Sequence, residues 1–313
     1  MNRIYGPAPR PFRLSLVLEE VGVDFEKALA FAQALDIHEV EFGSLGGQGI
    51  DLMSMNELAK AKRLLDKYGM RVQVVAGPAF KIVYLGSVPL EHIEREPHFQ
   101  EHLQMLRVQL TAACFFDAPL ARIFSFRREG MVAMGNPSPR HPQGGPFPEE
   151  MQEKVARALH LACQEAEKAQ VMLALENVRS CWGNSGHNTA LILERVNSPW
   201  LSVIWDPANG FVCGEEDAYP AGYEAVKPYI AHVHLKDAVV EDESSGLIRW
   251  ERIGDGDVGL KRQMAALQAD GYRGCVSIET HWSPPGGDKK TNTRRTYEGL
   301  VEILDSIPVY SAN

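Results

Sequence analysis

The chain has 313 residues, 45% of them hydrophobic, and a formal net charge of −9 at pH 7. A chain of this size can bury a core that covers a sheet on both faces, and its apolar content is too high for a disordered protein. The acidic balance argues against a nucleic-acid partner, which needs a basic footprint, and against binding to an anionic membrane. No apolar run is long enough to predict a membrane span.

The cysteine pattern bears on the redox compartment. The five cysteines are widely spaced without a C-x-x-C pair, which predicts reduced thiols and a cytoplasmic protein rather than a disulfide framework. Cys114, Cys163 and Cys275 lie in apolar segments and are expected in the core. Residues 1–13 contain no apolar stretch of the kind that a secretory signal needs.

Short apolar runs alternate with longer amphipathic stretches along the chain, which is typical of βαβ units around a parallel sheet. The predicted strands are Leu14–Leu18, Glu39–Phe42, Arg71–Ala76, Ala121–Phe126, Val171–Leu175, Leu201–Trp205, Ala231–Leu235 and Val276–Ile278. The predicted helices are Phe25–Leu35, Met55–Tyr68, Phe99–Phe116, Glu149–Ala169, Thr189–Val196, Ala218–Lys227, Leu260–Gln268 and Thr293–Leu304.

This order predicts the α/β class and a closed (β/α)8 TIM barrel, in which each of eight strands is followed by a helix. An open doubly wound sheet is the alternative, but it would more often carry a glycine-rich phosphate turn after its first strand, and residues 19–22 offer none. Without a linker or an internal repeat, we expect a single domain over residues 1–313, with its core at about 12–305. The long segments 127–148 and 238–259 follow strands and are expected to be substrate-contacting loops, or else solvated ones.

Charged or imidazole groups close the last four predicted strands: Glu176, Asp206, His234 and Glu279. In a barrel these strand ends meet on one rim, where catalytic groups gather. Each residue alone could be a satisfied structural group. Together, however, three buried carboxylates would repel one another, and a divalent cation relieves that repulsion while His234 adds a neutral nitrogen ligand. Mn²⁺, Mg²⁺, Co²⁺ and Zn²⁺ all suit such a ligand set.

These segments resemble the xylose isomerase-like superfamily of sugar phosphate isomerases and epimerases, over about residues 12–305. The matching segments are Leu175-Glu176-Asn177, Trp205-Asp206-Pro207-Ala208-Asn209, His232-Val233-His234-Leu235-Lys236-Asp237, Ile278-Glu279 and Gly254-Asp255-Gly256-Asp257-Val258. The resemblance implies one divalent ion, Mn²⁺ foremost, held by Glu176, Asp206, His234 and Glu279. It also implies that the two glutamates act as acid and base on opposite faces of a substrate that passes through a metal-stabilised enediolate.

Other polar residues near the strand ends are predicted to bind the substrate. They are Lys236, Arg127, Asn209, Trp182, His187, His281 and Glu41. Lys236 could polarise a substrate oxygen or contact a phosphate, and its alternative is a salt bridge to a rim carboxylate. Trp182 could stack on a sugar, and Arg127 suits a phosphate or carboxylate. His232 faces the same way as His234 but lies deeper, so we expect a structural role.

Asn209 stands where some epimerases and endonucleases of the superfamily have a histidine, which disfavours a multinuclear zinc site and an endonuclease. The predicted function is a divalent-metal-dependent isomerase or epimerase of a sugar, sugar phosphate or related hydroxy-carbonyl compound. The alternatives are a metal-dependent dehydratase of an inosose-like or keto-sugar substrate and a non-enzymatic sugar-binding protein. The expected partner is a small sugar, with neither nucleic acid nor membrane, and barrels of this superfamily often form homo-oligomers.

Overall fold

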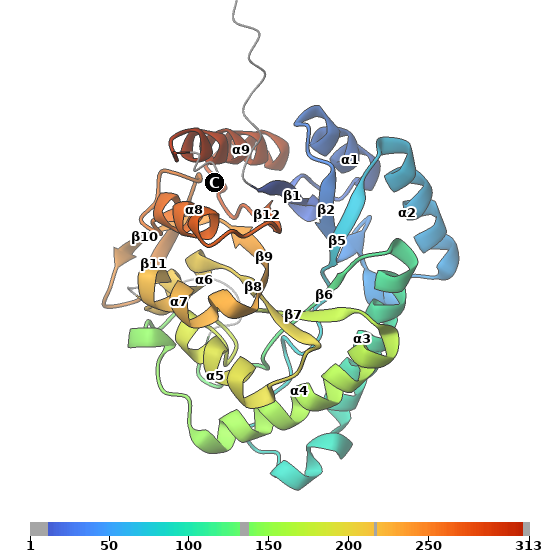
Figure 1. Ribbon diagram of the computed structural model, residues 1–313, viewed down its shortest axis with the longest axis vertical. Coiled ribbons are helices and arrows are strands. Elements are labelled where there is room, and N and C mark those ends of the chain that lie inside the picture. The colour runs from blue at the N-terminus through green and yellow to red at the C-terminus, as the bar shows by residue number, and fades with distance from the viewer. Residues whose placement is uncertain (1–11, 132–137, 216–217, 309–313) are drawn as a thin grey trace, which may run out of the picture.

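The computed structural model describes residues 12–131, 138–215 and 218–308. Most of the segment 1–13 discussed above, and residues 132–137 of one predicted loop, lie outside this part of the chain. Eight parallel strands close into a barrel in the order β1-β12-β9-β8-β7-β6-β5-β2, with helices around the outside (Figure 1). The predicted (β/α)8 barrel is therefore confirmed, and the open sheet is excluded.

All eight predicted strands are present. The barrel strands are β1 (Arg13–Val17), β2 (Glu39–Phe42), β5 (Arg71–Val75), β6 (Leu120–Ile123), β7 (Met172–Glu176), β8 (Leu201–Trp205), β9 (Ile230–Leu235) and β12 (Cys275–Ile278). The largest difference is at β6, which ends at Ile123 rather than at Phe126. Phe126 has a φ of 67°, a left-handed conformation that cannot continue a strand.

The helices cover the barrel in chain order. They are α1 (Phe25–Ala34), α2 (Met55–Tyr68), α3 (Pro97–Phe116), α4 (Glu149–Ala169), α5 (Gly186–Val196), α6 (Pro207–Cys213), α7 (Tyr223–Val226), α8 (Leu260–Ala269) and α9 (Lys289–Asp305). Short helical turns are η1 (Leu18–Glu20), η2 (Ile50–Leu52), η3 (Leu90–Arg95), η4 (Pro142–Gly144), η5 (Ala218–Gly222) and η6 (Lys227–Tyr229). The single helix predicted over 218–227 is split into η5, α7 and the start of η6, because Pro220 and Pro228 each lack the amide that a continuous helix needs.

Two antiparallel hairpins were not predicted. The strands β3 (Ser44–Leu45) and β4 (Gln48–Gly49) form a small one after β2. The strands β10 (Asp237–Asp242) and β11 (Leu247–Glu251) form a longer one within segment 238–259, which the sequence analysis treated as a loop. This second hairpin follows β9 directly and carries Trp250 toward the open end of the barrel, beside Lys236.

Side chains alternate between the two faces of the barrel strands. The main core lies between the strands and the helices, whereas the side chains of Val74, Ala76, Leu120, Ala174 and Ile204 form a separate small cluster. These residues lie on the strand face that also carries Glu176 and His234, so they form an apolar layer inside the barrel beneath a polar one. Within the described residues, no helix is long and apolar enough to cross a membrane.

One core prediction is wrong. Cys114 is exposed on α3, while Cys163 and Cys275 are buried as expected. The apolar neighbours of Cys114 in sequence face the core, but its own position on the helix faces outward.

Candidate metal centre

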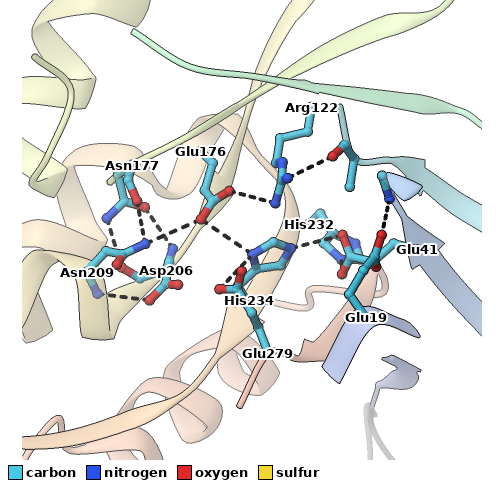
Figure 2. Close-up of polar contacts among 12 residues, drawn as sticks. Glu19, Glu41, Arg122, Glu176, Asn177, Asp206, Asn209, His232, His234 and Glu279 are labelled. Carbon is cyan, nitrogen blue, oxygen red and sulfur yellow. Dashed lines mark hydrogen bonds and ion pairs between the residues drawn. The ribbon is translucent and has the colours of Figure 1, made fainter. Parts of the chain in front are cut away.

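Four side chains from four neighbouring barrel strands converge at the carboxyl end of the barrel (Figure 2). Glu176 is the last residue of β7, Asp206 follows β8, His234 lies in β9, and Glu279 follows β12. All four are buried, and one ligand atom from each lies within 4.8 Å of the others. The structure thus brings together the four residues that the sequence analysis selected as metal ligands.

Two asparagines hold this group in place. The Asn177 side chain donates to the Asp206 carbonyl at 2.8 Å and accepts from the Asp206 amide at 2.8 Å. The Asn209 amide donates to Asp206 Oδ1 at 2.9 Å, because Asp206 is the N-cap of α6. Asn209 Nδ2 also donates to the Asn177 carbonyl at 2.8 Å and to Glu176 Oε1 at 3.4 Å. Asn209 therefore lies among the ligands, and its amide groups are already used within the protein.

Two buried cations pair with the carboxylates. Arg122 in β6 donates to Glu176 Oε2 at 3.1 Å and to the Ala76 carbonyl at 2.7 Å. Lys236 lies 2.7 Å from Asp206 Oδ2 and also donates to Glu279. Of the two roles considered for Lys236, the salt bridge to rim carboxylates is thus present in the structure.

These surroundings set the ionisation of the three acids. Burial opposes the charge on Glu279, but Lys236 and His234 outweigh it and hold its pKa well below the usual range. For Glu176, burial and the neighbouring Glu279 oppose ionisation, but Arg122 and His234 together outweigh them, so that the pKa of Glu176 is lowered. Burial dominates at Asp206 and raises its pKa to about 6. Both glutamates are therefore ionised at neutral pH and able to accept a proton.

Glu41, which was predicted to contact the substrate, lies inside the barrel beneath the metal-ligand cluster. It is fully buried, and its two oxygens lie 3.2 Å from His232 Nε2 and 3.0 Å from His234 Nε2 (Figure 2). Burial opposes its charge, but the two histidines hold the pKa of Glu41 well below the usual range. A carboxylate that accepts the Nε2 proton of His234 leaves Nδ1 of that ring facing Glu176 and Glu279, as a ligand atom requires.

We therefore expect Glu41→Gln to weaken metal binding by roughly 10- to 100-fold, because an outer carboxylate that orients a histidine ligand contributes about that much. The amide of glutamine can no longer hold both histidines by their Nε2 protons. Calorimetric titration with Mn²⁺ measures the change. Glu39→Gln is the control, since Glu39 lies two residues earlier in β2 and bonds to Arg71 and Gln73 instead. Equal affinities in wild type and Glu41→Gln would contradict this role.

The remaining predicted substrate contacts fall into two groups. Arg127 is buried and directed to the Met131 carbonyl and the Tyr84 hydroxyl. Trp182 is buried between Phe147, at 5.1 Å between ring centroids, and the Arg128 guanidinium. These two side chains hold the segments after β6 and β7 together. The side chains of His187, at the start of α5, and His281, beside Glu279, are exposed.

Sequence reasoning missed several residues of this site. Arg122 carried a signal, because an arginine inside a buried strand needs a partner, but its partner Glu176 lies 54 residues away. Asn177 belongs to the matching segment Leu175-Glu176-Asn177, but its pairing with Asp206, 29 residues away, has no local signal. Trp250 was hidden in a segment that was expected to be a loop, and its ring centroid lies 5.7 Å from Lys236 Nζ.

Asp237 fixes the hairpin relative to the site. Its carboxylate accepts hydrogen bonds from the amides of Ala238, Gly254, Gly256 and Val258, so it ties the start of β10 to the Gly254–Val258 turn. Burial nevertheless raises the pKa of Asp237.

We expect Asp237→Ala to lower the free energy of unfolding by about 2 kcal/mol or more, because it leaves several turn amides without an acceptor. Thermal unfolding measures the loss. Asp255→Ala, in the same turn but with an exposed side chain paired to Arg252, is the control and should change stability little. A loss no greater than that of the control would mean that the turn does not depend on Asp237.

The donor set fits a divalent cation. Asp206 Oδ2 lies 2.7 Å from Lys236 Nζ, and His234 Nδ1 lies 3.4 Å from Glu279 Oε2 and 3.7 Å from Glu176 Oε1, so both ligand atoms point into the cluster. The cluster contains four carboxylates, those of Glu41, Glu176, Asp206 and Glu279. Its two permanent cations, Arg122 and Lys236, balance only half of that charge. Burial opposes a charge on His234, but Glu41 and Glu279 outweigh it and raise its pKa well above the usual range, so the ring would lose its Nδ1 proton on binding a metal. The carboxylates then exceed the two permanent cations by two charges, which is the charge that a divalent ion supplies.

The protein is thus a closed (β/α)8 barrel with a candidate metal centre at the carboxyl end of its strands. A family model described as "xylose isomerase-like TIM barrel" matches residues 26–304, so the chain belongs to that family. The resemblance in the motifs around Glu176, Asp206, His234 and Glu279 is thereby confirmed at the level of the family.

Individual relatives agree with this assignment. The chain is 32% identical over 155 residues to a putative L-ribulose-5-phosphate 3-epimerase of Escherichia coli K12, a match that covers 49% of this chain and 50% of that protein. The match thus spans about half the length of this curated relative. A xylose isomerase domain protein from Planctomyces limnophilus has a TM-score of 0.68 at 19% identity, over 96% and 99% of the two chains. A D-allulose 3-epimerase from Methylomonas sp. has a TM-score of 0.68 at 17% identity, over 94% and 99%. At these identities the structural matches show the fold.

Proposed function

We propose that the protein is a divalent-metal-dependent isomerase or epimerase of a sugar or a related hydroxy-carbonyl compound. The observation that carries this proposal is the convergence of two ionised glutamates, Glu176 and Glu279, on one cluster with Asp206 and His234. The curated relative, a putative sugar-phosphate 3-epimerase, supports the same class of reaction. Its match covers only half of each chain, so the substrate is a separate question.

A divalent ion would be held by Glu176, Asp206, His234 and Glu279, and we propose Mn²⁺. The donor set of three carboxylates and one imidazole also suits Mg²⁺, Co²⁺ and Zn²⁺. When bound, such an ion polarises the substrate carbonyl and stabilises the negative charge that develops on its oxygen.

The protein side chains then move the proton. One of the two glutamates removes the proton from the carbon next to the carbonyl, and the substrate becomes an enediolate. In an epimerisation the other glutamate returns a proton to the same carbon from the opposite face. In an isomerisation the proton returns to the former carbonyl carbon, and the proton of the adjacent hydroxyl passes to the former carbonyl oxygen. Arg122 and Lys236, paired with Glu176 and Glu279, keep both bases ionised and in place.

The substrate is a small sugar, and we propose that it reacts in the cytoplasm, where the cysteines stay reduced. All five are free in the structure. The relatives leave both a sugar phosphate and a free sugar as candidates, since one is a putative L-ribulose-5-phosphate 3-epimerase and another a D-allulose 3-epimerase.

Hydrogen exchange in heavy water tests the proposal. Metal-loaded protein is incubated with a panel of ketoses, ketose phosphates and inososes, and deuterium incorporation is followed by NMR. We expect deuterium at a carbon adjacent to the carbonyl of one substrate class, with a new epimer or isomer as product. Loss of water from the substrate, detected by mass spectrometry, would instead indicate a dehydratase. Binding without any exchange would indicate a non-enzymatic sugar-binding protein.

A further inference from the structure

A cavity of about 340 Å³ opens beside the metal-ligand cluster, between the turn after β1, the β10–β11 hairpin and the segment after β12. Its lining includes Glu20, Trp250, Thr280, His281, Trp282 and Lys289. No role in the proton transfer proposed above uses these side chains. Its volume is at the lower end of the range of roughly 300–1,000 Å³ that is typical of small-ligand pockets.

The cavity adjoins the reacting centre. Thr280 and His281 directly follow Glu279 in the chain, and the ring of His281 lies edge-on to that of Trp250, at 4.9 Å between centroids. Lys236, which contacts Asp206 and Glu279, also lies 5.7 Å from the centroid of Trp250. A substrate whose reacting carbon lies at the cluster therefore has room to extend into this cavity.

The carboxyl group of Glu20 is uncommitted. Among the described residues, none forms a hydrogen bond or an ion pair with its side chain, although the residue is half-buried. Burial and the nearby Glu279 raise the pKa of Glu20 to about 8. As a neutral acid, Glu20 can both donate to and accept from a sugar hydroxyl, and as a carboxylate it can accept two.

The charges around the cavity disfavour a phosphate. Glu20 brings no positive charge in either protonation state, and the ionised Glu279, which would repel a phosphate, lies close by. The cation in the lining, Lys289, donates to the Glu19 carbonyl at 3.0 Å and is a single exposed ammonium. No arginine lines this cavity in the described part of the chain, whereas two tryptophans do. Flat aromatic rings with a few polar groups suit the apolar face and the hydroxyls of an uncharged sugar.

We infer that this cavity holds the end of the substrate away from the reacting carbonyl, and that this end is an uncharged, polyhydroxylated chain or ring rather than a phosphate ester. The inference rests on the proposed function and narrows its substrate class. Glu20 binds hydroxyls of the substrate, and Trp250 and Trp282 form the apolar walls.

Matched substrate pairs provide the test. Deuterium exchange by metal-loaded protein is measured for D-fructose against D-fructose 6-phosphate and for L-ribulose against L-ribulose 5-phosphate. We expect the free sugar of an active pair to have a kcat/KM at least 10-fold higher than its phosphate ester. A higher kcat/KM for the ester would overturn the inference while leaving the proposed function intact. Exchange with no sugar or ester would remove the proposed function, and the inference with it.

Variants assign the preference to this cavity. Glu20→Lys should lower kcat/KM for the free sugar at least 10-fold and shift the preference toward the ester, whereas Glu298→Lys, an equal charge change on the exposed side of α9, should do neither. Trp250→Ala should raise KM about 10-fold with little change in kcat. An unchanged preference in Glu20→Lys would overturn the inference.

Discussion

Glu279→Gln is expected to lower kcat by roughly 10²- to 10⁴-fold, the range that a positioned acid or base contributes. Glutamine fits the same space and can still hydrogen-bond to Lys236, so the fold should persist. It cannot take a proton from carbon. The rate is measured at saturating metal, with bound metal determined in the same samples, because Glu279 is also a proposed ligand. Glu298→Gln, on the exposed side of α9, is the matched control.

The two-glutamate mechanism makes a sharper prediction for deuterium exchange. In Glu279→Gln, exchange should cease for the epimer whose proton faces Glu279, while Glu176 should continue to exchange the proton of the other epimer. Glu176→Gln should show the reverse pattern. Turnover at the wild-type rate in Glu279→Gln would show that this carboxylate is not the base. If each variant lost exchange equally from both epimers, Glu176 and Glu279 would act only as metal ligands and not as the two bases.

Removing the metal is expected to lower the melting temperature by roughly 5–10 °C. An ion present at 100 times its dissociation constant stabilises the native state by about 2.7 kcal/mol, and each kcal/mol moves the Tm of a large domain by about 2–4 °C. Scanning calorimetry with and without a chelator measures the shift. Asp206→Asn should abolish it, and because asparagine is also a good N-cap, α6 should remain intact. Asp66→Asn, on the exposed face of α2, should keep the full shift.

The metal-dependent shift should also diminish with falling pH. A carboxylate must lose its proton to bind a metal, and burial raises the pKa of Asp206 to about 6. Below that pH, protonation of Asp206 competes with the ion, so the shift should be largest above pH 6 and fall as the pH is lowered through it. If neither the chelator nor the Asp206→Asn substitution changed the melting temperature, no ion would bind at this cluster.

The barrel and the convergence of Glu176, Asp206, His234 and Glu279 at its carboxyl end were both predictable from the sequence, because they depend on one local pattern. Buried strands expose alternate residues to the same side, so an acid or histidine that closes an apolar run is recognisable, as Glu176 and His234 are. Contacts between distant segments follow no such local rule. Trp182 is a residue type that can stack on a sugar, but Phe147, 35 positions earlier, stacks on its ring instead. Glu41 likewise could be placed on a strand, but not beneath His234.

The β10–β11 hairpin shows a second limit. The acidic run Glu241-Asp242-Glu243 at the end of β10, followed by two serines and a glycine in the turn, is typical of a loop, whether it contacts the substrate or is only solvated. The pairing of Val240 with Ile248 and of Ala238 with Trp250 depends on the register across the hairpin. That register places Trp250 beside Lys236 and in the wall of the cavity next to the metal-ligand cluster.

The central claim is that Glu176, Asp206, His234 and Glu279 bind one divalent ion. The most direct test is the metal content of purified protein by elemental analysis, followed by calorimetric titration of the chelator-treated protein with Mn²⁺, Co²⁺, Mg²⁺ and Zn²⁺. We predict one tightly bound ion per chain in the wild type and none in a variant that combines Asp206→Asn with His234→Gln. No uptake of any of these ions by the wild type, or equal uptake by the double variant, would contradict the claim.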